Sequence, residues 1–398
     1  MTMDALFNLD RAALAEGLDR VGADGWLLFD FHGCNPVAAR LLPGGMATRR
    51  TFVWLPREGP LTAIVHRIEM QPFEGFPGEI IPFARHAELQ AALSTTLGGQ
   101  RAAMEISPND AVPYLDRIPH GVVELLRSLG VTVVPSADLV TRFAAVWSSE
   151  EMASHCRSAE LLRSIALAAL AGAVHRTDGS LSESGLQAEV VAAMRAAGLF
   201  LTTLPIVGFG PNGANPHYEP KAGQDRVLGP NQVILLDLWG GEHEGSVFAD
   251  QTWMGFSGTA VPEKVARVWA TVRDARDAAI KVLQDRVAAG LPVPGYLGDQ
   301  AARGVIEAAG YGEYFVHRTG HSIDRDLHGS GPHLDDYETH DSRELLPGTG
   351  CSVEPGIYLS GEFGVRSEVN LYWGPTGMVV TPGKVQRELV TAGAGRER

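Results

Sequence analysis

Three histidines lie close together in the segment HRTGHSIDRDLHG, residues 317–329. His317 and His321 are four residues apart, and His328 follows seven residues later. Two imidazoles at the first spacing can bind one zinc ion from a single helix face. Gly320 interrupts that pattern, however, and no glutamate follows His317 directly. The spacing therefore indicates a metal site but leaves open which histidine binds.

Four carboxylates lie inside apolar segments that read as strands. They are Asp237 in LLDLW, Asp250 in VFADQTW, Glu354 in SVEPG and Glu368 in VRSEVN. A single acid in such a place more often lies at a strand edge or faces solvent, because charged residues are rarely buried without partners. Their arrangement in pairs favours a different interpretation.

Asp237 and Asp250 are equidistant from a point between His243 and Glu244, inside the glycine-rich segment GGEHEG (240–245), which predicts a hairpin turn. Such a hairpin places the two aspartates opposite each other on one face. Glu354 and Glu368 flank a turn in the same way (its centre is glycine 361). Like charges in direct opposition destabilise a sheet unless a cation neutralises them. Four carboxylates and a histidine suit two adjacent divalent ions.

The elements that must position these residues divide the chain near residue 147. Residues 1–146 alternate strand and helix signals, with strands such as GWLLFDF, RTFVWLP, LTAIVHR, EIIPFAR and VTVVP and a helix in GVVELLRSLG. Ser148 and Glu151 form an S-x-x-E capping box before a helix that we expect to reach about Val174. We predict an α/β chain with domains 1–146 and 147–398.

The second half combines further helices with the strands that carry the acids. We expect helices at 184–198, from 262 to about 289, and near 298–309. The strand signals are QVILLDLWG, VFADQTWMGF, GCSVEPGIYL and GVRSEVNLYW. This mixture predicts an α+β catalytic half whose acids come from two hairpins.

The composition limits the partners and the compartment. A net charge of −14 argues against nucleic acid and anionic membranes as partners. Three scattered cysteines predict no disulfide framework and favour a reducing compartment. The first residues lack the basic and apolar regions of a signal peptide, and no apolar run is long enough to span a membrane. We expect a cytoplasmic protein.

The order of the five residues resembles the ligand set of the M24 metallopeptidases, which have the pita-bread fold. GHSIDRDLHG resembles that family's G-H-G-I-G-x-x-x-H-E, and VEPGIY and GVRSE are close to its motifs. The likeness covers most of residues 150–380. NPHYEP (215–220) resembles the Pro-His segment of the proline-specific branch. Residues 1–146 resemble the creatinase-like N-terminal domain of that branch in size and in strand–helix pattern.

The resemblance implies a ligand set and a cofactor. It implies two divalent ions per chain, Mn²⁺ first, with Zn²⁺ or Co²⁺ as alternatives. Asp250 and Glu368 would bridge the ions, Asp237 would complete one, and His321 with Glu354 the other.

The resemblance also implies roles around the metals. Glu354 would shuttle protons, and His217 and His328 would donate to the developing oxyanion. His317 would line the substrate side with both of them. Arg366 lies two residues before Glu368 and therefore on the same strand face, so it would orient carboxylates and substrate. Each histidine here, and Arg366, could instead be an ordinary core or surface residue. For His155, His175 and His243 we favour that reading, and we expect Cys351 to pack in the core.

The implied activity is hydrolysis of the bond before proline in Xaa-Pro dipeptides, by a homodimer. Aminopeptidase P activity on longer proline-containing peptides is the alternative, and a non-peptidase binding protein of the same fold is a further one. Tyrosine and arginine are common near the second aspartate of the family, but Val247 and Trp253 occupy those positions here. The sequence therefore leaves open how the substrate's C-terminus is recognised and which residue is preferred before proline.

Overall fold

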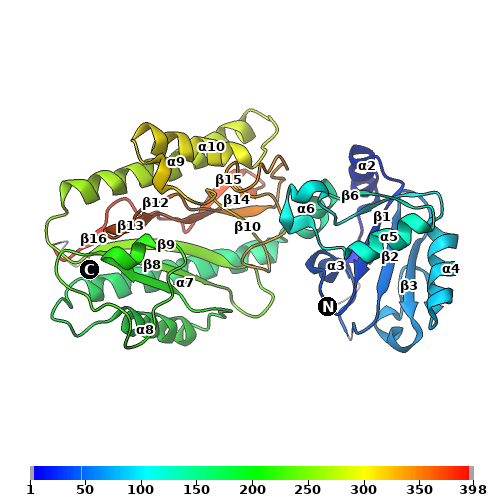
Figure 1. Ribbon diagram of the computed structural model, residues 1–398, viewed down its shortest axis with the longest axis horizontal. Coiled ribbons are helices and arrows are strands. Elements are labelled where there is room, and N and C mark those ends of the chain that lie inside the picture. The colour runs from blue at the N-terminus through cyan, green and yellow to red at the C-terminus, as the bar shows by residue number, and fades with distance from the viewer. Residues whose placement is uncertain (1–3, 46, 394–398) are drawn as a thin grey trace. The chain divides into compact units, whose positions relative to one another are not determined.

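The computed structural model describes residues 4–45 and 47–393, and the chain divides into two compact units (Figure 1). The units are Met1–Ala144 and Ala145–Arg398. The division falls two residues before the domain boundary that the sequence suggested. Among the described residues, no helix is long and apolar enough to cross a membrane.

Unit 1 is built on one mixed six-stranded sheet in the order β4-β3-β2-β1-β5-β6. Its strands are β1 (Gly25–Asp30), β2 (Thr51–Pro56), β3 (Leu61–His66), β4 (Gly78–Phe83), β5 (Arg101–Met104) and β6 (Thr132–Pro135). Its helices are α1 (Asp4–Phe7), α2 (Arg11–Val21), α3 (Pro36–Leu41), α4 (His86–Leu97), α5 (His120–Ser128) and α6 (Asp138–Ala144). The predicted strands of this half are confirmed.

Both faces of this sheet are buried under helices. Trp26 and Leu28 of β1 belong to one apolar cluster with residues of α2, α3 and α6. The alternate residues Leu27 and Phe29 belong to a second cluster with α4 and α5. Strands buried on both faces read as continuous apolar runs, which is why these segments were easy to predict.

Unit 2 contains four longer helices that flank its strands. They are α7 (Ser149–Ala173), α8 (Glu183–Ala196), α9 (Glu263–Ala288) and α10 (Tyr296–Ala308). The predicted capping box is confirmed at the start of α7. The Ser148 hydroxyl accepts from the Glu151 N–H at 3.2 Å, and the Glu151 carboxylate accepts from the Ser148 N–H at 2.8 Å.

The strands of unit 2 form two four-stranded sheets and one hairpin. The first sheet has the order β16-β9-β8-β7, with β7 (Ile206–Phe209), β8 (Val233–Gly240), β9 (Ala249–Phe256) and β16 (Val390–Thr391). The second has the order β10-β11-β14-β15, with β10 (Ser322–Ile323), β11 (Gly350–Val353), β14 (Val369–Gly374) and β15 (Gly377–Thr381). The hairpin pairs β12 (Gly356–Leu359) with β13 (Phe363–Arg366).

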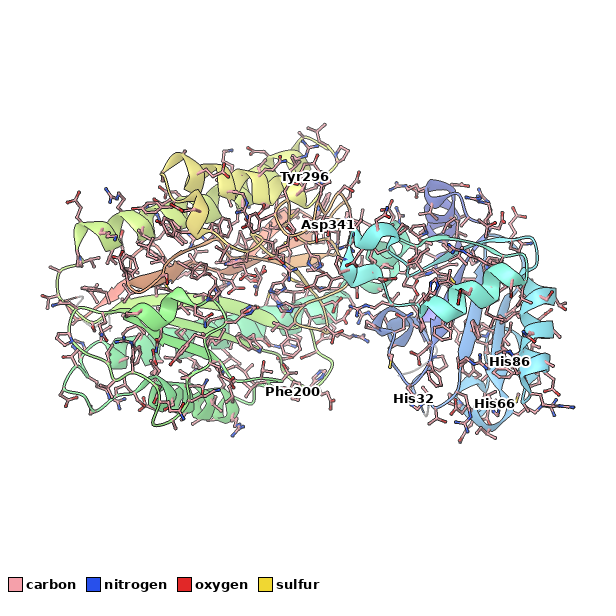
Figure 2. The ribbon with its side chains drawn as sticks, in the orientation of Figure 1. His32, His66, His86, Phe200, Tyr296 and Asp341 are labelled. Atoms are coloured by element: carbon pink, nitrogen blue, oxygen red, sulfur yellow. The ribbon has the colours of Figure 1, made fainter. Side chains whose placement is uncertain are left out.

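The two faces of β8 show how this fold prepares a polar site. Ile234, Leu236 and Leu238 pack in a cluster with α7 and α8. On the other face, Val233 and Leu235 join a cluster that includes α9 and α10. Asp237 is the next residue on that second face, so the acid directly follows the apolar residues Val233 and Leu235. Figure 2 shows the chain with its side chains drawn as sticks.

Candidate metal centre

The first pair of acids has a different register from the one we predicted. In the β8–β9 hairpin, Asp237 faces Thr252 and Asp250 faces Trp239. The two aspartates are therefore diagonal neighbours and do not stand directly opposite each other. The offset is two residues on each strand, and side chains alternate with a period of two, so both acids still point to one face. The predicted face is confirmed, and the predicted direct opposition is wrong because the turn is asymmetric about the segment's midpoint.

The second pair of acids has the predicted register. Gly356 faces Arg366 in the β12–β13 hairpin, and Val353 faces Val369 in the β11–β14 ladder. Glu354 and Glu368 follow one register between these two ladders and stand opposite each other. The proline that follows Glu354 cannot donate to a ladder. The two glutamates therefore lie in the interruption between the β11–β14 ladder and the β12–β13 ladder, where regular strand pairing stops.

One asparagine fastens the two hairpins together. The Asp250 N–H donates to Asn370 Oδ1 at 3.1 Å, and Asn370 Nδ2 donates to the Asp250 carbonyl at 2.6 Å. Asn370 lies on β14, two residues after Glu368. An ionised acid at this position could not donate the second bond. This two-point contact sets the distance between Asp250 and Glu368, and sequence reasoning missed it.

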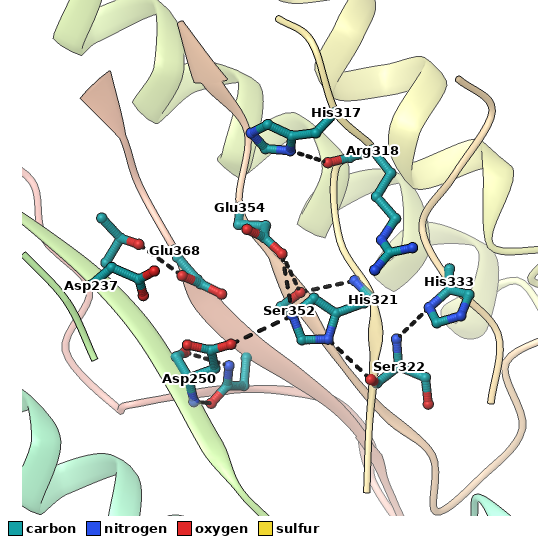
Figure 3. Close-up of polar contacts among 12 residues, drawn as sticks. Asp237, Asp250, His317, Arg318, His321, Ser322, His333, Ser352, Glu354 and Glu368 are labelled. Atoms are coloured by element: carbon teal, nitrogen blue, oxygen red, sulfur yellow. Dashed lines mark hydrogen bonds and ion pairs between the residues drawn. The ribbon is translucent and has the colours of Figure 1, made fainter. Parts of the chain in front are cut away.

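Asp250, His321 and Glu368 bring their ligand atoms within 4.8 Å of one another. His321 Nε2 lies 3.5 Å from Asp250 Oδ2 and 3.3 Å from Glu354 Oε1 (Figure 3). His321 and Glu368 are each 3% exposed, and Asp250 is 5% exposed. The structure therefore gathers an imidazole and three carboxylates from four strands or their ends.

The histidine segment of the sequence is extended at His321, so the paired-histidine helix is absent there. Ser322 and Ile323 form β10, which pairs antiparallel with β11. Gly320 is required by a close approach, since a Cβ on it would meet the Ser352 carbonyl oxygen at 2.1 Å. This packing directs His321 toward the acids.

Hydrogen bonds fix both the ring and the backbone of His321. Its Nδ1 lies 3.1 Å from the Ser322 carbonyl, so Nδ1 carries the proton and Nε2 presents a lone pair to the acids. The His321 N–H donates to Ser352 Oγ at 2.9 Å, and Ser352 Oγ donates to Glu354 Oε1 at 3.0 Å. Ser352 thus links two of the site residues, and no sequence signal singled it out.

Three buried carboxylate oxygens at this site have no hydrogen-bond partner. They are Asp237 Oδ1, Asp250 Oδ1 and Glu368 Oε1. Buried carboxylates ordinarily have all their oxygens paired, because an unpaired buried acceptor costs about 1–3 kcal/mol or more. Oxygen atoms are the ligands that hard divalent cations prefer. The site therefore fits a metal by its unused acceptors as well as by its residue types.

The electrostatics also call for a cation. Burial raises the pKa of Asp237 to about 7, although Arg366 opposes the effect. Burial and repulsion from Glu354 raise the pKa of Asp250 well above its usual range, and burial and repulsion from Asp250 do the same for Glu368. Glu354 behaves differently: burial opposes its ionisation, but His321 and Arg366 outweigh that effect and lower its pKa. A divalent ion would allow all of these acids to ionise.

Arg366 and Thr252 form a second layer behind the acids. Arg366 is 3% exposed and donates to Asp237, and its Nε donates to Thr252 Oγ1 at 2.8 Å. Thr252 Oγ1 in turn donates to Glu368 Oε2 at 2.8 Å. Arg366 therefore contacts one of the acids directly, and Thr252 extends the chain of contacts to Glu368.

His317 and His328 lie on either side of His321. His317 is half-buried, with Nε2 2.8 Å from the Tyr358 hydroxyl and Nδ1 2.7 Å from the Arg318 carbonyl. His328 is exposed and packs edge-on against His321, with ring centroids 4.3 Å apart. The structure thus brings both histidines to the site. Neither of them belongs to the group of acids around Nε2 of His321.

His217 is exposed on the segment that follows β7. The pKa of His328 is lowered mainly by partial loss of hydration. The charges of neighbours that include His321 and His217 lower it further. His217 is therefore within electrostatic reach of His328. The carbonyl of its neighbour Pro216 lies 3.5 Å from Arg366 Nη1.

The residues that we expected to be ordinary lie away from the acids. His155 is buried on α7 between the Phe248 carbonyl and Thr381 Oγ1, each 2.7 Å from a ring nitrogen. His175 and His243 are exposed. Cys351 is fully buried in an apolar cluster, as predicted.

The two unusual positions near the second aspartate both lie in apolar clusters. Val247 is buried in an apolar cluster with Phe248 and Trp147. Trp253 belongs to the cluster beneath α7, on the other face of β9 from Asp250. Our expectation that these positions adjoin the site is wrong for Trp253, because residues three apart on a strand point to opposite faces.

A loop between β10 and β11 carries His328 and is internally fixed. The Asp341 carboxylate accepts two bonds from Arg343 and one from the His333 N–H at 2.9 Å. Arg343 also donates to the Ser330 carbonyl at 2.7 Å. Asp341 and Tyr296, which begins α10, are labelled in Figure 2, and the Tyr296 N–H donates to the Asp341 carbonyl at 3.2 Å.

The sequence model of metallopeptidase family M24 matches residues 155–373, which is more than half of the chain. The chain belongs to this family. Among M24-like relatives, the probable dipeptidase PepE of Mycobacterium bovis is 27% identical over 333 residues, which cover 80% of this chain and 80% of that protein. The Xaa-Pro dipeptidase of Lactobacillus helveticus is 34% identical over 163 residues, 41% of this chain and 40% of that one.

A solved prolidase of Thermococcus sibiricus has the same fold. It matches with a TM-score of 0.67 and 25% identity, covering 96% of this chain and 98% of the prolidase. The predicted M24 membership and pita-bread fold are confirmed.

Proposed function

We propose that this M24 peptidase is an Xaa-Pro dipeptidase with two divalent ions. The observation that supports the metal site most strongly is the set of unpartnered buried oxygens on Asp237, Asp250 and Glu368. The proposed ligands are Asp237, Asp250, His321, Glu354 and Glu368. Asp250 and Glu368 are proposed as the bridging pair, and Mn²⁺ as the native ion, since carboxylate-rich sites favour hard cations.

Two bound ions would supply a water of lowered pKa and a polarised scissile carbonyl. Glu354 is the residue that we propose to accept the proton of that water. Its carboxylate is only partly buried, with 14% of the side chain exposed, and its lowered pKa keeps it ionised and ready to accept. It would then pass the proton to the proline nitrogen, which becomes the leaving amine.

His328 and His217 are proposed to stabilise the oxyanion that forms on the attacked carbonyl. His328 lies beside His321, and its lowered pKa makes the ring neutral, so its N–H donates a hydrogen bond. His317, held by Tyr358, and Arg366 are proposed to line the substrate side. The three histidines are proposed to act on the substrate, whereas Arg366 also pairs with Asp237.

The substrate is proposed from the relatives and from the chemistry of proline. A bond that precedes proline has no N–H, so a peptidase for it needs a dedicated site. An Xaa-Pro dipeptidase and a prolidase are among the proteins that this chain resembles. Dipeptides are therefore the proposed substrate, and longer proline-containing peptides, the substrates of aminopeptidase P, are the alternative that the assay must separate.

The decisive assay compares Xaa-Pro dipeptides with Xaa-Pro-Xaa tripeptides and longer peptides, in metal-free protein supplemented with Mn²⁺ or Zn²⁺. We expect chelation to abolish hydrolysis and Mn²⁺ to restore it, with the highest kcat/KM for dipeptides. A higher kcat/KM for tripeptides would replace this proposal with aminopeptidase P activity. Full hydrolysis without metal would overturn both.

A homodimer and a cytoplasmic location remain predictions for this chain. Sedimentation at working concentration would test the first, and a fully active monomer would contradict it. Neither prediction is needed for the metal site, because every proposed ligand belongs to unit 2.

A further inference from the structure

A single buried carboxylate fastens the segment that carries His217. Glu183 begins α8 and is 0% exposed. Its Oε1 accepts from the Phe209 N–H at 2.6 Å, where β7 ends. Its Oε2 accepts from Asn212 Nδ2 at 2.9 Å. These two bonds hold the beginning of the segment 209–226.

The same carboxylate also holds the middle and the end of this segment. Glu183 Oε2 accepts from the Tyr218 hydroxyl at 2.7 Å and from the Arg226 N–H at 2.9 Å. Burial and the charge of Glu183 raise the pKa of Tyr218, so its hydroxyl stays protonated and donates. One side chain thus receives four hydrogen bonds from a stretch of 18 residues.

The start of α8 suits this role. Ser182 caps the helix by accepting from the Gly185 N–H at 3.1 Å, and the Glu183 N–H donates to the Arg226 carbonyl at 3.0 Å. A negative charge in the first turn is stabilised by the helix dipole. The carboxylate is therefore held rigidly on a regular element while its partners lie on an irregular one.

His217 lies between two residues that are anchored on opposite sides. Tyr218 binds Glu183 through its hydroxyl, and the Pro216 carbonyl contacts Arg366 Nη1 at 3.5 Å. Arg366 in turn binds Asp237 of the metal centre. An exposed histidine on an irregular segment would otherwise have many conformations available to it.

We propose that Glu183 is a positioning residue, which holds His217 at the substrate side through Tyr218 and Pro216. The inference rests on the proposed role of His217 in the peptidase reaction. Glu183 itself touches neither the acids nor the substrate, so its effect on rate must pass through the segment 209–226.

The kinetic test is a double-mutant cycle with His217→Ala. Tyr218→Phe removes one bond to Glu183 and little else, and Glu183→Gln places an amide donor against a donor. We expect each to lower kcat/KM by about 3- to 10-fold in the wild-type background. In the His217→Ala background we expect each to cost less than about 2-fold, because the group that they position is gone. Equal losses in both backgrounds would overturn the proposal.

Glu105→Gln is the matched control. Glu105 is 0% exposed in unit 1 and accepts from Trp26 Nε1 at 2.6 Å and Asn35 Nδ2 at 2.9 Å. Its replacement removes a buried carboxylate whose two side-chain donors, Trp26 and Asn35, both belong to unit 1. Any loss that it causes should be the same with and without His217, and a Glu183-like dependence on His217 in this control would overturn the positioning account.

Hydrogen–deuterium exchange separates this inference from the proposed function. In metal-loaded protein, Glu183→Gln and Tyr218→Phe should each speed exchange in peptides covering 210–226 and leave 350–374 unchanged. Unchanged exchange in 210–226 for both variants would overturn the inference whatever the activity. If the wild-type chain hydrolyses no Xaa-Pro bond, the proposed function fails, while the exchange result still decides whether Glu183 anchors the segment.

Discussion

Glu105 in unit 1 and the acids of unit 2 are buried to a similar degree but are satisfied very differently. Glu105 receives bonds on both oxygens, from Trp26 and Asn35. Asp250 and Glu368 each keep one buried oxygen without a partner. Burial raises the pKa of all three. Burial and a raised pKa therefore do not distinguish a structural acid from a metal ligand.

The difference lies in what the surrounding chain offers. Around Glu105, which follows β5, the fold supplies two donors, Trp26 near the start of β1 and Asn35 before α3. Around Asp250 and Glu368 the fold supplies other acids and one imidazole whose lone pair points inward. The unsatisfied acceptors are the part of the site that only a cation can complete.

The largest expected effect comes from His321→Ala. His321 Nε2 lies 3.5 Å from Asp250 and 3.3 Å from Glu354, so the substitution removes a proposed metal ligand. We expect activity and metal content to fall together, by more than the roughly 10–100-fold that loss of an outer hydrogen-bond partner costs. Metal analysis alongside kinetics checks this. Retained metal with lost activity would show that His321 acts on the substrate.

His328→Ala should separate rate from metal binding. We expect both ions to remain and kcat to fall by roughly 10²–10³-fold, the cost of losing one oxyanion donor. His317→Ala should also keep the ions and lose less, with part of the loss in KM, because Tyr358 holds this ring on the substrate side. If either variant loses metal as fully as His321→Ala, the single-imidazole assignment is wrong.

Thr252→Val tests the layer behind the acids. The hydroxyl that it removes accepts from Arg366 and donates to Glu368, and the valine keeps the side-chain shape. We expect metal affinity to fall by roughly 10–100-fold, with kcat at saturating metal nearly unchanged. Titration of activity with Mn²⁺ measures this. An unchanged midpoint of the Mn²⁺ titration would show that Thr252 does not contribute to metal affinity.

The smallest expected effect is a dependence of stability on pH that metal removes. Asp237, Asp250 and Glu368 have raised pKa values, so in the absence of metal these three carboxyls bind more protons in the folded chain than in the unfolded chain. Their contribution to stability should therefore be full below about pH 4 and decrease as pH rises through their raised pKa values. Thermal unfolding across this range, with and without Mn²⁺, measures the difference. An identical pH profile in both conditions would contradict the account.

Much of the fold could be predicted from the sequence. The capping box at Ser148 and the apolar strands around Asp237 and Glu368 are local signals, and local signals determine helix starts and strands. The same-face placement of each pair followed from the period of two. The direct opposition of Asp237 and Asp250 did not follow, because the exact register of a hairpin depends on its turn, and the turn sequence does not specify it.

The contacts that assemble the site could not be predicted from local pattern. Asn370 joins segments more than 100 residues apart and Ser352 joins segments more than 30 residues apart, and polar residues at such positions look like ordinary strand residues. Glu183 lies one residue before the helix that we expected at 184–198, and its four partners are spread over a segment without a periodic signal. Long-range pairing of this kind becomes visible only when the strands are placed next to one another.

The most direct test of the central claim is Mn²⁺ binding by metal-free protein, measured by equilibrium dialysis or calorimetry on the wild type, Glu368→Gln and Glu105→Gln. The account predicts two ions per chain for the wild type and for Glu105→Gln, and loss of at least one ion for Glu368→Gln. It also predicts that bound Mn²⁺ raises the Tm of the first two proteins more than that of Glu368→Gln. A wild type that binds no Mn²⁺, or a Glu368→Gln variant that binds it like the wild type, would contradict the claim that these unsatisfied acids form a metal site.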